Sequence, residues 1–268
     1  MMNIKKMFGL VAIGACLLLS ACEEKAELIQ PEPETDDISF TVNGVSFTMK
    51  RVEGGNFRMG SDGYLFDVVE DEMPTHNVAL STFHIGETEV TQALWTAVMG
   101  DNPSAQSVAD GSTHPVENVS WTDCQLFIER LNQLTGRIFG LPTEAQWEFA
   151  ARGGMKDCGN KYSGSGNIQT VGWFADNAPS PRQVKQKEPN ELGLYDMTGN
   201  VGEWCRDWYG LYSNTFQENP LGHHSGTRRV VRGGNWTAPD DRCRNTSRDA
   251  QSPEYHSSAI GLRLVLRY

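Results

Sequence analysis

Two glutamates spaced four residues apart are the first side chains in this sequence that could do acid–base chemistry. Glu144 and Glu148 follow a helix-start pattern at Thr143 and would lie on one face of the same helix. A pair of carboxylates can act as a general acid and a general base. A structural role is favoured, because glutamates near a helix start also cap it and accept buried hydrogen bonds from loop backbone.

Thiols and imidazoles are the next groups that could bind a metal or form covalent bonds. Six histidines are scattered, and His223-His224 is typical of a solvated loop. No CxxC and no Cys/His set with zinc spacing occurs. Phosphate loops with Lys, Gly-x-Ser-x-Gly and His-Glu-x-x-His are also missing from the sequence. Four cysteines beyond the N-terminal segment allow three full disulfide pairings, with no choice among them: Cys124, Cys158, Cys205 and Cys243.

The N-terminal segment is typical of a secreted lipoprotein. Lys5 and Lys6 precede an apolar run, residues 7–20, that is too short for a permanent membrane helix. The run ends in Leu-Ser-Ala before Cys22, which resembles the bacterial lipobox, with an ordinary signal peptide as the alternative. The sequence thus predicts a signal peptide at 1–21, a lipidated Cys22 and membrane attachment through the lipid. An exported chain can form disulfides.

Residues 22–37 are acidic and contain two prolines, so they predict an unfolded tether before a domain at 38–268. Acidic residues just after a lipidated cysteine resemble a surface-export signal of one group of Gram-negative bacteria. We therefore expect a lipid-anchored protein of the cell envelope, on the outer membrane, with surface exposure as a hypothesis. The formal net charge of −11 argues against a nucleic-acid partner, whose phosphates require basic surfaces.

The elements that must position these side chains are short strands, about three helices and long loops. Asn43-Gly44 predicts a tight hairpin over 40–48, and further strands are expected near 55–60, 76–85, 230–232 and 262–266. N-cap residues and terminal glycines predict helices over 91–100, 120–136 and 143–153. Residues 155–229 are interpreted as mostly loop. Segregated strands and helices favour an α+β domain.

Seven ordered blocks carry a resemblance to a known family: GNFRMG (55–60), ETEVT (87–91), PVENVSW (115–121), LPTEAQWEFAARGG (141–154), PNELGLYDMTGNVGEW (189–204), RGGNW (232–236) and IGLR (260–263). Together they resemble the sulfatase-modifying-factor family, which includes formylglycine-generating enzymes. The resemblance covers roughly residues 50–268. It implies an irregular α+β fold related to C-type lectins.

The resemblance also identifies the positions of a copper site. The enzymes of the family hold Cu(I) between two thiolates five residues apart, since soft Cu(I) prefers soft ligands. Those positions are Ala238 and Cys243 here, and an active-site serine position is Asn235. Alanine cannot ligate copper. Copper is therefore not expected, and Cys243 is interpreted as a packing or disulfide cysteine and only secondarily as a catalytic one.

A calcium site of the family is better retained. The matching oxygen donors are the carboxylates of Asp196 and Glu203 and the carbonyls of Gly199 and Val201. Gly199 can adopt the unusual backbone conformation that turns a carbonyl inward. The alternative is that the two carboxylates only brace a turn.

The polar stretch 237–258 corresponds to the ligand-binding face of lectin-like relatives. Tyrosine and arginine are side chains typical of binding hot spots. Arg244, Arg248 and Arg263 have an alternative interpretation, as partners of buried carboxylates. The candidate ligand-binding residues are Asp240, Asp241, Arg242, Asn245, Tyr255 and His256.

The sequence therefore favours a lipid-anchored, non-catalytic module that binds a protein or a glycan. One alternative is an oxidoreductase that converts a peptide cysteine to formylglycine with Cys243 and an unorthodox second ligand. Another is an assembly factor of an outer-membrane secretion or motility complex.

Overall fold

The computed structural model describes residues 36–63, 69–106 and 113–268. The expected signal peptide, Cys22 and residues 22–35 of the expected tether lie outside the described residues. The described residues belong to one compact unit. Within the described ranges, no helix is both long and apolar enough to cross a membrane.

The three expected helices are confirmed as α1 (Gln92–Met99), α2 (Trp121–Thr135) and α3 (Glu144–Ala151). Each begins after a hydroxyl N-cap, Thr91, Ser120 or Thr143, whose side chain accepts a backbone N–H of the first turn. A short α4 (Ile168–Val171) and the 3₁₀ helices η1 (Glu70–Glu72), η2 (Gly154–Lys156) and η3 (Asp240–Cys243) complete the helical content of the described residues.

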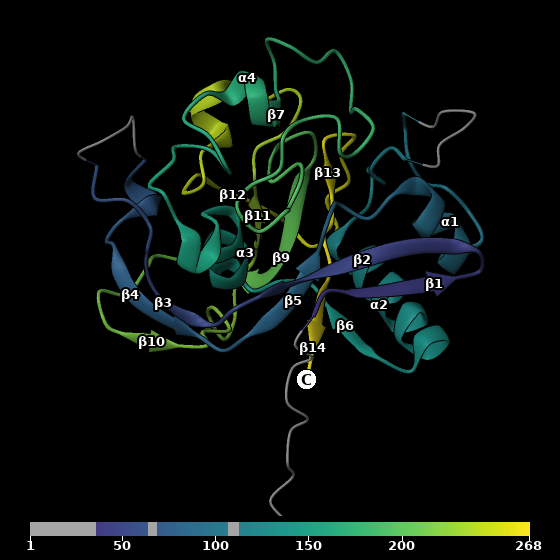
Figure 1. Ribbon diagram of the computed structural model, residues 1–268, viewed down its shortest axis with the longest axis horizontal. Coiled ribbons are helices and arrows are strands. Elements are labelled where there is room, and N and C mark those ends of the chain that lie inside the picture. Colours follow the sequence, from purple (N-terminus) through teal and green to yellow (C-terminus); the bar gives the residue numbers. More distant parts are fainter. Residues whose placement is uncertain (1–35, 64–68, 107–112) are drawn as a thin grey trace, which may run out of the picture. The chain divides into compact units, whose positions relative to one another are not determined.

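The expected hairpin is β1 (Ile38–Val42) and β2 (Val45–Val52). Asn43 and Gly44 take φ of 48° and 84°, as a type I′ turn requires. The hairpin forms one side of a five-stranded sheet, in the order β1-β2-β5-β14-β6, with β5 (Phe83–Gly86), β14 (Val265–Arg267) and β6 (Ile138–Gly140). Figure 1 shows α1 beside this hairpin and α3 beside β9.

Two further sheets and a strand pair position the candidate sites. A three-stranded sheet has the order β10-β4-β3, with β3 (Gly55–Met59), β4 (His76–Leu80) and β10 (Gln217–Glu218). A four-stranded sheet has the order β12-β11-β9-β13, with β9 (Gly202–Trp208), β11 (Arg229–Arg232), β12 (Arg248–Gln251) and β13 (Ile260–Gly261). The pair is β7 (Gly172–Trp173) with β8 (Thr198–Gly199).

Residues 155–229 are mostly loop, as expected, but they also contain the seven-residue strand β9. Its first five residues are buried, with Trp204 and Cys205 fully inaccessible. A strand buried on both faces lacks the polar–apolar alternation that marks a half-exposed strand. The sequence signal was therefore absent although the strand is central.

Two residues just before the expected domain start at residue 38, Asp36 and Asp37, contact the domain. The Asp37 carboxylate accepts the Arg51 backbone N–H at 2.9 Å, and the Asp36 carbonyl accepts from the His84 ring at 2.8 Å. Arg51 belongs to β2 and His84 to β5. The last two residues of the expected tether are thus held against β2 and β5.

Candidate functional site

Glu144 and Glu148 form buried ion pairs, which confirms their structural interpretation. Arg248 contacts both carboxylate oxygens of Glu144, at 2.6 and 2.8 Å. Arg232 donates to Glu148 at 2.5 Å, and the backbone N–H of Gly60 donates to the other Glu148 oxygen at 2.9 Å. These contacts join β3, α3, β11 and β12, so the two carboxylates hold the fold together and are not available as an acid–base pair.

The other two arginines of the alternative interpretation are also partners of buried carboxylates. Arg244 contacts both oxygens of Glu72 at 2.6 Å. Arg263 contacts Glu203 at 2.7 and 3.0 Å. Arg244, Arg248 and Arg263 are all buried. They are therefore confirmed as structural residues of the domain.

The position of the family's copper site is a cavity of about 280 Å³ over β11 and η3. Ala238 and Asn235 line it, and Cys243 packs beneath Ala238 in a small apolar cluster. Burial raises the pKa of the Cys243 thiol to about 12. The site has one protonated thiol where two thiolates would be needed.

None of the other cysteines in the described residues lines this cavity. Cys124 and Cys205 are buried in the two main apolar clusters, and Cys158 is exposed. All four cysteines of the described residues, Cys243 included, are free thiols. The three disulfide pairings that the sequence left open are therefore not formed, and Cys243 is a packing cysteine.

The loop expected to bind calcium brings together several carboxylates and one buried arginine. Both oxygens of Glu203 accept from Arg263, and one of them also accepts the Trp147 indole N–H at 2.6 Å. One oxygen of Asp196 accepts the Lys185 backbone N–H at 2.8 Å, and the other is buried without a partner. Across the described residues, no group of three or more His, Cys, Asp or Glu is arranged to hold a metal.

The electrostatics of this loop nevertheless favour a cation. Burial raises the pKa of Asp196 to about 6, although its hydrogen bond from Lys185 lowers it. Burial and the charges of Asp196 and Glu203 raise the pKa of Glu89 well above its usual range. Three buried carboxyl groups, those of Glu89, Asp196 and Glu203, are therefore crowded around one buried guanidinium, that of Arg263, and their mutual repulsion disfavours full ionisation. Asp196 has one carboxylate oxygen free to bind a cation, whereas Glu203 is already paired with Arg263. Calcium binding therefore stays a prediction.

Gly199 has the unusual backbone conformation that the sequence predicted. Its φ is +75°, and a Cβ atom there would lie 2.0 Å from the Trp173 carbonyl oxygen. Any other residue would collide with β7, so the glycine is required for the path of the loop whether or not calcium binds.

The six candidate ligand-binding residues do not line one hollow. Arg242 borders the 280 Å³ cavity, and Asn245 borders a different cavity beside Arg58 and Arg152. His256 borders a third hollow near α2 and pairs with Asp123 at 2.9 Å.

The other three of these residues differ in how exposed they are. Asp240 accepts the Tyr162 hydroxyl at 3.1 Å, while the backbone carbonyl of Asp241 accepts from Arg244. Tyr255 is 43% exposed. Asn245 is buried, and its amide donates to the Asn160 carbonyl at 3.1 Å. Stretch 237–258 therefore combines structural residues with a few exposed ones, of which Arg242 and Tyr255 remain open to a partner.

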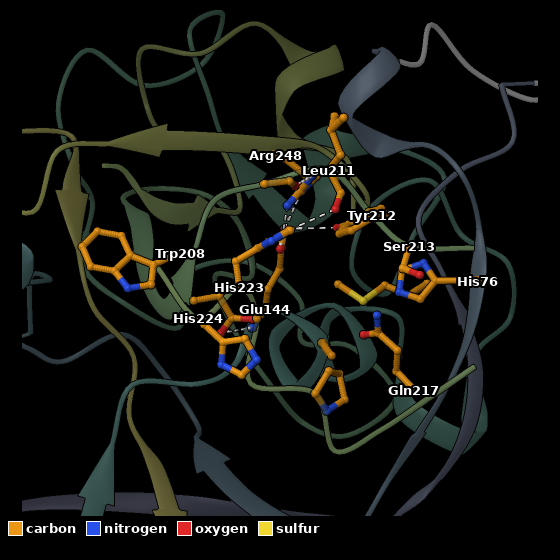
Figure 2. Close-up of a pocket in the computed structure, with 16 residues that line it drawn as sticks. His76, Glu144, Trp208, Leu211, Tyr212, Ser213, Gln217, His223, His224 and Arg248 are labelled. Atoms are coloured by element: carbon orange, nitrogen blue, oxygen red, sulfur yellow. Dashed lines mark hydrogen bonds and ion pairs between the residues drawn. The ribbon is translucent and has the colours of Figure 1, made fainter. Parts of the chain in front are cut away.

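Sequence reasoning did not anticipate a second cavity, of about 230 Å³, next to the copper position. We call it the β10 cavity. Arg248 borders both cavities. Figure 2 shows Trp208 and His224 on one side of it and His76, Ser213 and Gln217 on the other. Its lining residues are Met59, His76, Glu144, Ala145, Asp207, Trp208, Gly210, Leu211, Tyr212, Ser213, Gln217, Pro220, Gly222, His223, His224 and Arg248.

Glu144, Tyr212 and Arg248 form a polar cluster in the lining of the β10 cavity and contact one another. The Tyr212 hydroxyl donates to Glu144 at 3.1 Å, and the Arg248 guanidinium lies 3.9 Å from the Tyr212 ring centre. Arg248 and Arg232 hold the pKa of Glu144 below its usual value against the effect of burial. Burial and the Glu144 charge raise the pKa of Asp207 to about 7.

One sequence signal could have pointed to this cavity. Residues 207–224 contain aromatic, histidine and glycine residues in a segment interpreted as loop, including the His223-His224 pair. Both histidines are indeed exposed, and His223 contacts the Leu211 carbonyl at 3.0 Å. What the sequence did not indicate is that β3, β4 and α3 form the opposite wall.

Comparison with known proteins agrees with this geometry. A family model described as "Sulfatase-modifying factor enzyme 1-like domain" matches residues 43–268. Chaperone protein LppX of Paenibacillus barcinonensis is 32% identical over 248 residues, covering 72% of this chain and 80% of the relative. The formylglycine-generating enzyme of Streptomyces coelicolor is 29% identical over 284 residues, covering 80% of this chain and 87% of the enzyme.

Solved structures show the same architecture. Treponema denticola variable protein 1 is 33% identical, with a TM-score of 0.79, covering 87% of this chain and 99% of the other. PvdO from Pseudomonas aeruginosa has a TM-score of 0.72 at 22% identity, covering 88% and 100% of the two chains, and shows the fold alone. The expected irregular α+β fold is thereby confirmed.

Proposed function

Since the chain belongs to the family of sulfatase-modifying factor enzyme 1-like domains, we propose that it is a lipid-anchored member that recognises a ligand without copper oxidase chemistry. The observation that carries the proposal is the pair of copper positions. Ala238 has no ligand atom, and Cys243 is 1% exposed with a thiol pKa raised to about 12 by burial. Cu(I) has no two-thiolate site between them.

The cavity at this position retains polar groups suited to binding. Asn235, Arg242 and Asp249 line it in place of the thiolate pair. Hydrogen-bonding and charged groups recognise a ligand but do not supply the electrons that oxygen chemistry needs. The buried arginine–carboxylate pairs make a rigid base for this face, which supports recognition by preformed surfaces.

The proposed location and ligand class come from the sequence and the relatives. The lipobox-like segment before Cys22 supports a lipid anchor in the cell envelope, on the outer membrane. A relative named a chaperone protein is in line with a role in binding other molecules. The ligand of this chain is proposed to be a protein or a glycan.

An oxidase assay tests the proposed function. We expect the purified mature chain, reduced and loaded with Cu(I), to bind no stoichiometric copper and to form no aldehyde on a Cys-x-Pro-x-Arg peptide under oxygen. Mass spectrometry detects loss of the thiol and gain of the aldehyde. A formylglycine-generating enzyme of the family serves as the positive control, and aldehyde formation by this chain would refute the proposal.

We further propose that Ca²⁺ binds near Asp196, where buried carboxyl groups are crowded together and one Asp196 oxygen has no partner. At pH 7.5, 1 mM CaCl₂ should raise the melting temperature by several degrees relative to EDTA, since a ligand at about 100 times its dissociation constant contributes about 2.7 kcal/mol. Asp196→Asn should abolish the shift. Equal melting temperatures with CaCl₂ and EDTA would contradict calcium binding.

The pH dependence without calcium provides a second check on Asp196. Its folded pKa of about 6 exceeds the ordinary value of 3.8, so the folded state binds the proton more tightly than the unfolded state. Its contribution to stability is full below about pH 4 and is lost as the pH rises through about 6. In EDTA, Asp196→Asn should therefore flatten the stability profile over this range.

A further inference from the structure

We infer that the β10 cavity binds one uncharged pyranose unit of a glycan. This inference rests on the proposed function, because it names the ligand class of a recognition module. It concerns a cavity that is separate from the copper position, with Arg248 between the two.

The charged groups of the cavity disfavour an anionic ligand. Its one arginine, Arg248, uses all of its nitrogens within the molecule: Nε and Nη2 contact Glu144, and Nη1 donates to the carbonyls of Asp71 and Gly210 at 2.7 and 3.1 Å. Four of its five N–H donors are thereby used, so this cation cannot offer the pair of parallel donors that a phosphate or a carboxylate usually takes from arginine. Asp207 also lines the cavity and would repel an anion when ionised.

A cationic ligand is disfavoured for a related reason. The Glu144 carboxylate is neutralised by Arg248 and also accepts the Tyr212 hydroxyl. The Tyr212 ring has the Arg248 guanidinium 3.9 Å from its centre, so a ligand ammonium would meet an existing positive charge there. The cavity therefore favours a ligand with no net charge.

Two rim side chains are available to such a ligand. The Gln217 amide and the His224 ring line the cavity, and neither has a hydrogen-bond partner anywhere in the described part of the chain. An amide and a neutral imidazole each donate and accept, which matches the hydroxyl group, itself both a donor and an acceptor. Figure 2 shows Gln217 and His224 on opposite sides of the pocket, so a ring with hydroxyls on both edges can meet both.

Apolar surface completes the match to a pyranose, whose ring carbons present C–H groups. Leu211 is 72% exposed at the edge of the cavity, and Trp208 and Pro220 also line it. A ligand that covers the apolar surface of these three side chains removes it from water, which is favourable. The hydroxyl groups of a pyranose can hydrogen-bond to the polar lining residues, and its C–H face can pack on the apolar ones.

The walls are fixed before a ligand arrives. The Tyr212 hydroxyl is held by Glu144, and the His223 ring contacts the Leu211 carbonyl at 3.0 Å. Gly222 approaches Asp207 so closely that a Cβ atom would lie 2.6 Å from the Asp207 Cβ. A preformed pocket loses little conformational entropy on binding, which suits a small ligand with few contacts.

Saturation-transfer NMR and calorimetry on the mature chain test this inference. The probes are the neutral methyl pyranosides of glucose, galactose, mannose and N-acetylglucosamine, with glucuronic acid and glucosamine as charged counterparts. We expect at least one neutral pyranoside to bind and the charged sugars to bind more weakly. Gln217→Ala and His224→Ala should each weaken binding about fivefold, as expected for one lost hydrogen bond.

His256→Ala is the matched control, because His256 is also exposed but borders a different hollow. It should leave pyranoside binding unchanged, and circular dichroism checks that every variant is folded. The inference is overturned if no neutral pyranoside binds, if a charged sugar binds more tightly, or if neither rim variant weakens binding. Such a failure leaves the proposed function standing, whereas aldehyde formation would remove that function regardless of sugar binding.

Discussion

Replacing Arg232 by alanine should lower the free energy of unfolding by about 3–5 kcal/mol, the usual cost of breaking a buried ion pair. The Arg232 side chain is fully buried and contacts Glu148, also fully buried, at 2.5 Å. It also donates to the backbone carbonyls of Asn245, Thr246 and Ser247. Its loss leaves a buried carboxylate with less compensation and three carbonyls without this donor.

Urea unfolding followed by tryptophan fluorescence measures this effect. For a chain of this size, such a loss corresponds to a fall in melting temperature of roughly 10 °C. Arg58→Ala is the matched control, since Arg58 is 64% exposed and its ion pair with Asp62 spans 3.8 Å. It should change stability by less than about 0.5 kcal/mol. A similarly small change for Arg232→Ala would show that the ion pair does not stabilise the fold.

The arginine–carboxylate pairs explain how a chain with long loops keeps a defined shape. Arg244 reaches Glu72, which lies 172 positions earlier in the sequence, and Arg248 reaches Glu144. Each pair fixes a C-terminal segment to an element formed much earlier. These contacts cannot be read from local pattern, because an isolated arginine in a polar stretch looks the same whether it is solvated or buried.

Features that depend on neighbouring residues were predictable. Thr143 with Gln146 forms the expected capping box of α3, and Asn43-Gly44 forms the expected turn. Gly100 and Gly136 end α1 and α2 in the left-handed conformation. In each case the residue type alone sets the local backbone, so the sequence is sufficient.

Features that depend on distant segments were not predictable. The β10 cavity requires His76 from β4 and Gln217 from β10, which are neighbours in one sheet, and Arg248 from β12, which belongs to another sheet. The ligand-binding residues expected in 237–258 were grouped by sequence, whereas the folded segment places Arg242, Asn245 and His256 at three different hollows. A site formed across sheets is thus harder to predict than a site formed by a motif.

Ala238→Cys should create the copper site that this chain lacks. Ala238 packs against the cluster that contains Cys243, so a thiol at 238 would face a second thiol. A second ligand on the same protein raises affinity by roughly 10²–10⁴-fold over a single one through effective concentration. We therefore expect stoichiometric Cu(I) binding by the variant and none by the wild type, measured by competition with a chromogenic Cu(I) chelator.

The protonation state of Cys243 sets the conditions of this test. Its thiol pKa is raised to about 12 by burial, so copper must displace a proton to bind. Copper affinity should therefore increase with pH, and a titration at pH 8 is more sensitive than one at pH 7. Ala238→Ser and the double variant Ala238→Cys/Cys243→Ala are the controls, and both should stay copper-free. If Ala238→Cys binds no copper, the missing thiol alone does not account for the loss of the site, and the positions of the two side chains must differ from those in the enzymes.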